Sequence, residues 1–324
     1  MTSVASAYAD AEVDPVAAGR SAQPPSAGLF DLDGPPDGAT TNGGRRRRHP
    51  ADPFRAGHRI APGYTVQQHL SRGDAFDVYE VWSSLRQCSC IAKTVRPDCR
   101  SRRMQERLAA EGRLLVEATH PHLLRAYEIV GGERPVVILE TLPGPTLEAM
   151  VENARRRLAS GDLCQLGLQL CSVVGYLHRR GCLHLDIRPA NIIASDGLAK
   201  LIDLSLARPP GPAPAGNGCP NYLAPEQARG DGVSAATDVW GIGATLYEAA
   251  TGQKPFAPLD ASEQELCDRD GYVQLVRPVV PLRRLRRRLP SRFVAAVEQC
   301  LQPSPSRRPT VARLTRELTS LLDQ

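Results

Sequence analysis

The segment His184-Leu185-Asp186-Ile187-Arg188-Pro189-Ala190-Asn191, followed twelve residues later by Asp203, decides how this sequence is interpreted. It brings a carboxylate, a carboxamide and a second carboxylate into one short stretch. The residues between Asn191 and Asp203 have the pattern of a strand, a tight turn and a second strand, so we expect a hairpin that returns Asp203 beside Asn191 and Asp186. Oxygen ligands for magnesium next to a free carboxylate are typical of phosphoryl transfer to a hydroxyl group.

The composition is that of an ordinary globular protein. The chain has 324 residues, of which 42% are hydrophobic and 23% charged, enough for one large domain or two small ones with a tail. The net charge is +5, and only Lys93, Lys200 and Lys254 among the 40 basic residues are lysines. This arginine bias indicates codon usage in a GC-rich bacterial genome, and we expect no nucleic-acid partner from charge alone.

The sequence gives no sign of a membrane or secreted protein. No apolar run approaches the length of a membrane helix, and Met1–Asp14 lacks the basic start and apolar stretch of a secretory signal. Nine cysteines without framework spacing suit a reducing compartment, so we expect a cytoplasmic protein. Cys88, Cys90 and Cys99 could form part of a metal site, but a fourth ligand with suitable spacing is missing, which favours simple thiols.

The domain organisation follows from shifts in composition. Residues 1–57 are rich in Ala, Gly, Pro and Ser and are expected to be a disordered tail, with Arg45–Arg48 as a solvated arm or a contact for an acidic partner or anionic lipid. Residues 58–324 form the expected folded domain. Its first part, 58–140, should hold an antiparallel sheet and one helix. The expected strands are Tyr64–Leu70, Val78–Trp82, Ser89–Thr94, Leu124–Val130 and Val136–Glu140, and the expected helix is Arg102–Ala118.

The second part of the domain, 146–324, has mainly helical patterns. The expected helices are Leu147–Leu158, Asp162–Arg179, Ala235–Thr251, Arg292–Leu301 and Val311–Leu322. The linker between the two lobes, Thr141–Pro145, is short, so a ligand cleft is expected between them. The fold class is therefore α+β, with a small antiparallel β lobe carrying one helix and a larger, mainly helical lobe.

From about Tyr64 to Leu322 the chain resembles a eukaryotic-type serine/threonine protein kinase domain, of the kind that bacteria also carry. The resemblance rests on motifs that occur in the family's order: Ile91-Ala92-Lys93, the segment from His184 to Asn191, Asp203-Leu204-Ser205, Ala224-Pro225-Glu226 and Asp238-Val239-Trp240-Gly241-Ile242-Gly243. It implies a bilobal fold, ATP and Mg²⁺ (or Mn²⁺) as cofactors, and a protein substrate. It also implies an ion pair between Glu226 and Arg308.

The resemblance assigns a catalytic role to each polar residue. Lys93 would contact the α- and β-phosphates of ATP and pair with Glu111, with Glu117 as the second choice. Asp186 would accept the proton of the substrate hydroxyl, and His184 would hold the loop. Asn191 and Asp203 would hold the metal. Arg188 stands where the family has a lysine near the transferred phosphate, with the same charge and a different shape.

The resemblance also implies a set of nucleotide contacts. Backbone groups of Glu140-Thr141-Leu142 would bind the adenine, Leu139 would lie behind it, and Ala92 and Val78 would line its faces. Leu70 and Gly73 would lie in the phosphate-covering loop. The same apolar positions could also simply pack the core.

Several positions depart from the family pattern. In the phosphate loop, Ser71 and Phe76 replace two of three glycines, and Asp74 and Asp77 add negative charge near an anionic ligand. Ser205 replaces a glycine and Cys219 a threonine. Leu185 replaces an arginine that grips a phosphorylated activation loop in many relatives, and residues 206–223 contain no Ser or Thr. We therefore predict activity without activation-loop phosphorylation.

Three functions remain open from the sequence alone. The first is a Ser/Thr protein kinase, and the second is a pseudokinase that senses nucleotide or acts as a scaffold. The third, a small-molecule kinase, is disfavoured by Ala224–Glu226 and Asp238–Gly243. The basic run Arg283–Arg288 predicts either a solvated helix face, with Leu282, Leu285 and Leu289 inward, or docking of an acidic protein segment. The substrate, upstream signal and oligomeric state are not indicated.

Overall fold

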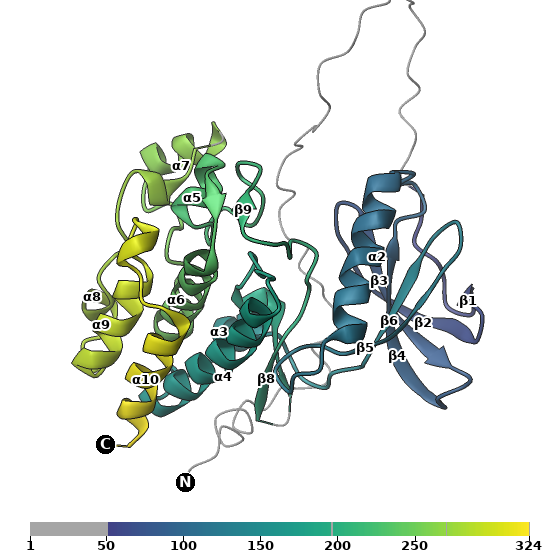
Figure 1. Ribbon diagram of the computed structural model, residues 1–324, viewed down its shortest axis with the longest axis horizontal. Helices are drawn as coiled ribbons and strands as arrows, with labels where there is room; N and C mark the ends of the chain where they lie inside the picture. The colour runs from purple at the N-terminus through teal and green to yellow at the C-terminus, as the bar shows by residue number, and fades with distance from the viewer. Residues whose placement is uncertain (1–50, 196, 270, 324) are drawn as a thin grey trace, which may run out of the picture.

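The protein has two lobes, which lie side by side in Figure 1. The structure is a computed structural model, and it describes residues 51–195, 197–269 and 271–323. The N-lobe is an antiparallel sheet with one helix, and the C-lobe is mainly helical. The bilobal α+β fold expected from the sequence is confirmed, while Arg45–Arg48 and most of the expected tail lie outside the described residues.

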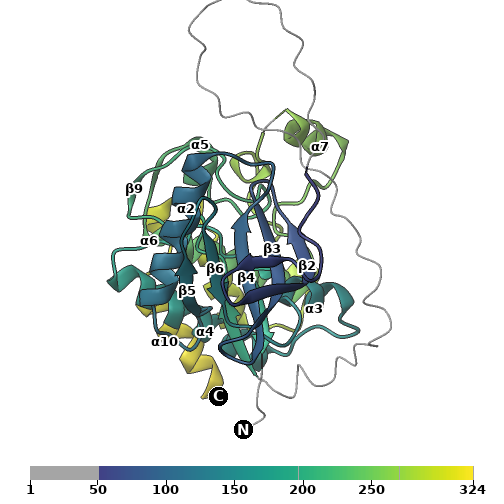
Figure 2. The ribbon, with the colours of Figure 1, turned by 90° about the vertical axis from the view of Figure 1, so that its right-hand side faces the viewer.

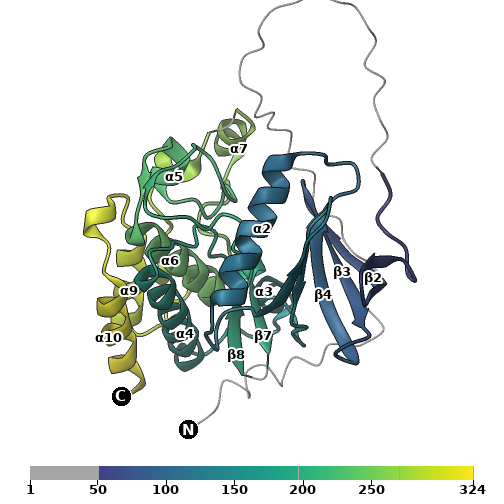
Figure 3. The same ribbon diagram turned by 45° about the vertical axis from the view of Figure 1, so that its right-hand side comes forward.

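The N-lobe sheet has six strands in the order β1-β2-β3-β4-β6-β5. Their bounds are β1 Arg59–Ala61, β2 Tyr64–Arg72, β3 Phe76–Ser83, β4 Cys88–Val95, β5 Ala126–Val130 and β6 Val136–Leu139. Helix α2, Arg102–Glu117, covers the face of this sheet that is turned toward the C-lobe (Figures 1 and 3). All five expected strands are present, and the short β1 is an addition because three residues carry little periodic signal.

Strand alternation gives the sheet two distinct faces. In the register of β3 and β4, Val78 pairs with Lys93 and Tyr79 pairs with Ala92. Tyr79 and Ala92 are fully buried in a cluster on the outer face together with Val81. Successive side chains point to opposite faces of a strand, so Val78 and Lys93 face α2 and the C-lobe instead.

The chain before residue 58 is packed against the outer face of this sheet. The Phe54 ring stacks on His58 at 4.2 Å, and the Phe54 amide donates to the Tyr79 hydroxyl at 3.1 Å. Arg72 donates to the Ala51 carbonyl at 2.9 Å. The folded part therefore extends at least to Ala51, earlier than the expected start at residue 58, because a single aromatic residue anchors a segment that is otherwise poor in large apolar side chains.

The C-lobe is built around a nearly all-buried helix. This is α6, Ala235–Thr251, in which Trp240 and Tyr247 are each 1% exposed. The other helices are α3 Leu147–Asn153, α4 Ser160–Arg179, α5 Pro225–Arg229, α7 Ala261–Asp268, α8 Leu282–Leu285, α9 Ser291–Cys300 and α10 Val311–Leu322. Figure 1 shows α4, α6, α9 and α10 grouped on the side away from the N-lobe sheet.

The expected hairpin joins the two halves of the site. Strands β7, Ile192–Ser195, and β8, Leu198–Leu201, pair antiparallel, with Ile192 opposite Leu201. Beyond the pairing, the Ile202 amide donates to the Asn191 carbonyl at 2.8 Å. Figure 3 shows the hairpin beside α4, on the side of this helix that is turned toward the N-lobe. This closure carries the chain back so that Asp203 follows directly beside Asn191.

Several helices differ from the expectation: α3 ends at Asn153 and not at Leu158, and the short α5 was not predicted. Helix α7 was not predicted, since none of its residues is buried and its sequence has no apolar stripe. It projects at the edge of the C-lobe in Figure 2. Helix α8 is a single turn, and Leu285 is 37% exposed, so its expected inward position is wrong, whereas Leu282 and Leu289 are buried. No helix in the part of the chain that the structure describes is long and apolar enough to cross a bilayer.

Candidate active site

The site is centred on Lys93, which contacts acidic groups from both lobes. Its Nζ lies 2.8 Å from Glu111 Oε1 and 2.9 Å from Glu111 Oε2, and 3.0 Å from Asp203 Oδ1. Lys93 comes from β4, Glu111 from the middle of α2 and Asp203 from the segment after β8. The predicted partner Glu111 is confirmed, whereas Glu117 is exposed at the end of α2.

Lys93 and Asp203 hold each other in their charged states, whereas burial, opposed in part by the charge of Lys93, raises the pKa of Glu111 above its ordinary value. Burial opposes ionisation of Lys93, but the two carboxylates raise its pKa above the ordinary value. Burial also opposes ionisation of Asp203, but the charge and hydrogen bond of Lys93 lower the pKa of Asp203 far below its usual range. Asp203 is therefore an anion with part of its carboxylate still accessible, at 35% side-chain exposure.

The loop that carries Asp186 is fixed to the start of α6. Asp238 accepts hydrogen bonds from the backbone amides of His184 and Leu185, at 2.9 and 2.8 Å, and from His178 at 2.8 Å. A β-carbon on Gly241 would lie 2.9 Å from Ile187 Cβ, so only glycine lets the loop lie this close to α6. His184 is fully buried, and its Nδ1 accepts a hydrogen bond from the Asp186 amide at 3.2 Å, which is consistent with the expectation that it holds the loop.

Asp186 and Asn191 form a hydrogen-bonded pair. The Asn191 amide nitrogen donates to Asp186 Oδ2 at 2.7 Å and to the Asp186 carbonyl at 2.9 Å. Arg188 Nε lies 3.4 Å from the Asp186 carboxylate, close enough for charge attraction but a weak hydrogen bond. These contacts orient the carboxylate and leave Asp186 only partly buried.

The side-chain oxygens of Asn191 and Asp203 fit a magnesium ion. Because the Asn191 nitrogen is held by Asp186, the side-chain oxygen is the atom left for a metal, and Asp203 supplies an ionised carboxylate. Magnesium takes one or two protein oxygens and completes its shell with phosphate and water. Residues 51–195, 197–269 and 271–323 contain no group of three or more His, Cys, Asp or Glu side chains that could hold a metal ion. This holds also for the segment with Cys88, Cys90 and Cys99.

The phosphate loop is a tight turn with an aromatic side chain over Lys93. The Gly73 amide donates to the Phe76 carbonyl at 2.8 Å, which closes the turn between β2 and β3. Lys93 Nζ lies 5.3 Å from the centre of the Phe76 ring. Phe76 stands at the family's third glycine position, so its ring occupies space on the face of the sheet that carries Lys93.

Asp77 does not point toward this space. It is fully buried on the outer face, where Arg72 makes two hydrogen bonds to its carboxylate, both 2.8 Å, with His69 at 3.2 Å and Tyr79 at 3.1 Å. Burial opposes ionisation, but Arg72 and His69 lower the pKa of Asp77 below its ordinary value. Asp77 therefore brings no negative charge toward a ligand on the Lys93 face, because its charge is neutralised by Arg72 on the other side of the sheet, while Asp74 is exposed.

Some of the residues expected to contact adenine lie on the face of the sheet that carries Lys93. Val78 and Leu139 lie on the face of the sheet that carries Lys93, since Val78 pairs with Lys93 and Leu139 with Ile91. The expectation for Ala92 is wrong, because Ala92 is buried in the outer cluster. Ile91, two residues before Lys93, takes the position on the inner face. The alternation of the strand could have shown this from the sequence.

The segment between the lobes is fixed by Glu140. Its carboxylate accepts from Lys200 at 2.6 Å and from the Arg125 amide at 2.9 Å, so strand β8 is tied to the N-lobe. Leu142 packs against the main core, and Leu70 in β2 is 46% exposed. The role of Lys200 was not predicted, since its partner is sixty residues away in the chain.

Hydrogen bonds from neighbouring elements hold the segment after Asp203. Asp203 has a positive φ of 66°, a strained conformation for a residue other than glycine, and the Ser205 amide donates to its carboxylate at 3.0 Å. Arg107 on α2 donates to the Ser205 carbonyl at 2.6 Å, and Leu204 is buried. Further along, Gln274 donates to the Pro220 and Leu223 carbonyls, both at 3.0 Å.

Cys219 lies in this segment beside the catalytic loop. Together with Asp186 and Tyr222 it lines a cavity of about 10 Å³, room for a single water molecule. Burial raises the pKa of the Cys219 thiol, so the group is neutral.

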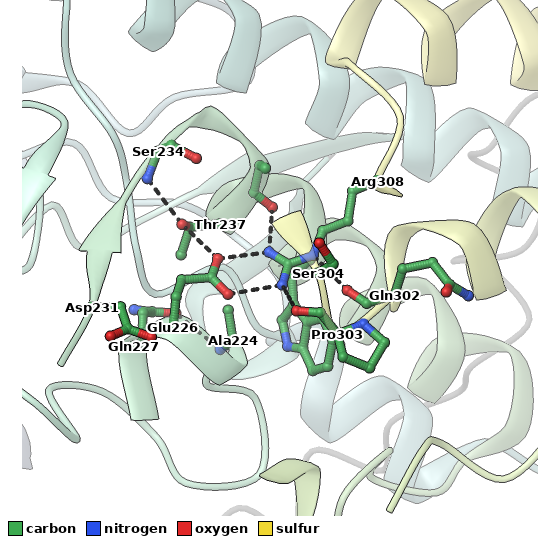
Figure 4. Close-up of polar contacts among 12 residues, drawn as sticks. Ala224, Glu226, Gln227, Asp231, Ser234, Thr237, Gln302, Pro303, Ser304 and Arg308 are labelled. Carbon is green, nitrogen blue, oxygen red and sulfur yellow. Dashed lines mark hydrogen bonds and ion pairs between the residues drawn. The ribbon is translucent and has the colours of Figure 1, made fainter. Parts of the chain in front are cut away.

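The Glu226–Arg308 ion pair expected from the sequence is present (Figure 4). Arg308 makes two parallel hydrogen bonds to the Glu226 carboxylate, at 2.6 and 2.8 Å, and Thr237 adds one at 2.9 Å. Arg308 also donates to the Ala236 and Gln302 carbonyls. A buried guanidinium with this many acceptors connects α5, α6 and the turn before α10, and so fixes the far end of the segment that begins at Asp203.

Comparison with known proteins agrees with the geometry. A family model described as "Protein kinase domain" matches residues 64–318. The probable serine/threonine-protein kinase SCO3848 of Streptomyces coelicolor is 30% identical over 212 residues, which are 61% of this chain and 31% of that protein. The serine/threonine-protein kinase PknB of Mycobacterium tuberculosis is 29% identical over 225 residues, 64% of this chain and 34% of that protein. The chain thus spans about a third of the length of these curated relatives.

Proposed function

The chain belongs to the protein kinase domain family, and from this premise we propose that it transfers the γ-phosphate of ATP to serine or threonine hydroxyls of proteins. The observation that carries the proposal is the contact of Lys93 with both Glu111 and Asp203. Phosphoryl transfer depends on positioning and charge stabilisation, and this contact supports a site in which the two lobes are already aligned.

Each residue has a defined part in this proposal. Lys93 binds the α- and β-phosphates, and Glu111 keeps its ammonium in place. Asp186 orients the substrate hydroxyl and accepts its proton, and Arg188 supplies positive charge beside it. Asn191 and Asp203 would hold Mg²⁺ or Mn²⁺, which supplies charge neutralisation of the phosphates when bound.

The proposed nucleotide contacts are the residues on the inner face of the sheet and in the linker between the lobes. They comprise Leu70, Gly73, Val78, Ile91, Leu139, Glu140 and Leu142. The proposed compartment is the cytoplasm. We propose further that activity does not need a phosphate on the activation segment, because backbone and side-chain hydrogen bonds already hold that segment.

A transfer assay tests the proposal. Purified protein is incubated with γ-labelled ATP, Mg²⁺ or Mn²⁺ and a generic basic protein, beside an Asp186→Asn variant and a sample without metal. Metal-dependent transfer that disappears in Asp186→Asn supports the kinase. A thermal shift with ATP but no phosphate transfer contradicts the kinase proposal and supports the pseudokinase alternative. The altered glycine pattern of the phosphate-covering loop is the observation that favours this alternative.

A further inference from the structure

Two arginine-rich segments that are far apart in the sequence meet on the C-lobe. Arg155–Arg157 lie in the link between α3 and α4, and Arg283–Arg288 begin within α8 and continue beyond its end. Arg286 joins them, since its Nη2 donates to the Leu158 carbonyl at 2.6 Å and its Nη1 to the Ala250 carbonyl at 3.1 Å. We call the resulting surface the arginine face; its members are Arg155, Arg156, Arg157, Arg283, Arg284, Arg286, Arg287 and Arg288.

The end of helix α6 lies between the two segments. Gly252 ends this helix with a φ of 72°, and a β-carbon there would lie 2.0 Å from Arg157 Nη1. The guanidinium of Arg157 therefore rests directly on the Gly252 backbone. Burial, followed by the charge of Arg157, lowers the pKa of Arg286. Arg157 and Arg286 are therefore close enough to repel each other. The fold brings the two arginine segments together in spite of this repulsion.

The positive charge of the arginine face is not neutralised by ion pairs in the part of the chain that the structure describes. None of its eight arginines forms an ion pair there, and all except Arg286 are exposed. Two acidic groups on adjoining elements have other partners, since Glu148 lies 3.3 Å from Lys254 and Glu298 accepts from the Leu282 amide at 2.9 Å. Glu152 on α3 and Asp162 on α4 also lie near Arg155–Arg157 in the sequence, but neither forms an ion pair with these arginines within the described residues. The arginine bias of the whole sequence explains why these residues are arginines and not lysines. It does not explain why they gather on one face, where the repulsion between like charges lowers the stability of the fold.

We propose that the arginine face docks an acidic segment of the protein substrate, rich in Asp and Glu and separate from the acceptor hydroxyl. This rests on the proposed kinase function. Guanidinium groups bind carboxylates through paired hydrogen bonds, which suits such a segment. Neither arginine segment contains an aromatic residue for stacking on bases, and Leu285 is the only large apolar side chain exposed among them, so nucleic acid and membrane are poorer fits.

A binding measurement tests the docking without requiring catalysis. A fluorescent peptide rich in Glu and Asp is titrated with the full chain and followed by anisotropy at low and moderate salt. The test variant is Arg156→Glu/Arg287→Glu, one residue from each segment. The matched control is Arg103→Glu/Arg316→Glu, which makes the same charge change at exposed positions elsewhere. The proposal expects binding that weakens about tenfold or more in the test variant and little in the control.

A kinetic comparison separates docking from catalysis. Two substrate peptides share one acceptor sequence, and only one has the acidic segment appended. The test variant should raise KM for the extended peptide alone and leave kcat and the minimal peptide unchanged. Equal loss of binding in both variants overturns the proposal. It is also overturned if a single-stranded oligonucleotide or phosphatidylserine vesicles bind through these arginines while the acidic peptide does not. If peptide binding follows the proposal but no transfer occurs, the proposed kinase function has failed and the docking surface stands.

Discussion

Lys93 and Asp203 lie 110 residues apart in the chain, and the Lys93 Nζ is 3.0 Å from Asp203 Oδ1. One residue belongs to the N-lobe sheet and the other to the C-lobe, so this contact fixes how the lobes face each other. Glu111 holds the same ammonium from α2. The cation proposed to bind phosphate and the carboxylate proposed to bind the metal are therefore brought together by the fold of the protein itself.

Replacing Lys93 by Met should abolish most transfer and also destabilise the protein. Glu111 would be left buried without its partner, and breaking a buried ion pair from one side costs about 3–5 kcal/mol. Loss of a charge aimed at the transferring phosphates should lower kcat at least about 100-fold. Urea unfolding and transfer assays on the same preparations measure both effects.

The double variant Lys93→Met/Glu111→Leu separates the two effects. Replacing both members of a buried ion pair by apolar residues is often neutral for stability. We expect the double variant to unfold near the wild-type midpoint and to remain inactive. Full activity in either variant would show that Lys93 takes no part in the chemistry.

Phe76→Gly should improve ATP binding. The Phe76 ring lies over the Lys93 ammonium, and its removal lets the loop backbone approach the phosphates. We expect KM for ATP to fall several-fold, at a cost to stability of about 1 kcal/mol or more from glycine in a strand and lost packing. The Phe76→Ala variant loses the ring but keeps a β-carbon. Its KM for ATP should lie between the values for the wild type and for Phe76→Gly. Weaker ATP binding in both variants would contradict this account of the ring.

Asp77→Asn should destabilise the N-lobe in a pH-dependent way. The charged hydrogen bonds of Asp77 predict a loss of about 2 kcal/mol at neutral pH. The pKa of Asp77 is lower in the folded protein than its ordinary value of 3.8, so the stabilisation is present above that pH and is lost as the pH falls through the folded value. The difference between wild type and variant should therefore shrink below about pH 3.8.

Exposed Asp74 supplies the control for this measurement. Asp74→Asn should change the unfolding free energy by no more than about 0.5 kcal/mol at any pH. Denaturant titrations of the three proteins from pH 7 to pH 3 give the comparison. A constant difference between wild type and Asp77→Asn across this range would mean that the Asp77 charge is not the stabilising element.

Activity should survive removal of phosphate from the activation segment. Between Leu204 and Glu226 the only hydroxyl side chains are Ser205 and Tyr222, and Tyr222 is buried and donates to Glu248. Phosphatase treatment followed by mass-spectrometric mapping and a transfer assay should give a dephosphorylated, active protein. A required phosphate at Ser205 or Tyr222 would refute the prediction.

Motif spacing predicted the parts of the site that depend on short stretches of chain. Asp186 and Asn191 lie five residues apart, and the short hairpin of β7 and β8 returns the chain to Asn191 directly before Asp203. The Lys93–Glu111 and Glu226–Arg308 pairs, which are far apart in the chain, followed from the family resemblance and not from local physics.

Errors arose where a side chain's surroundings decide the outcome. Ala92 was assigned to the nucleotide face although strand alternation directs it away from Lys93. Asp77 was expected to add negative charge near the phosphates, because no local pattern indicates that Arg72 and the chain around Phe54 cover it on the outer face. Helix α7 has no buried residue, so periodicity had nothing to detect.

The most direct test of the proposed chemistry measures ATP affinity and the rate of phosphate transfer together on wild type and Asp186→Asn. Asp186 contacts Asn191 and Arg188 but is not among the proposed nucleotide contacts. The account predicts nearly unchanged ATP affinity and a kcat lowered by about 10²–10⁴-fold, the usual contribution of a positioned base. Equal transfer rates in the two proteins, or no metal-dependent transfer by the wild type, would contradict it.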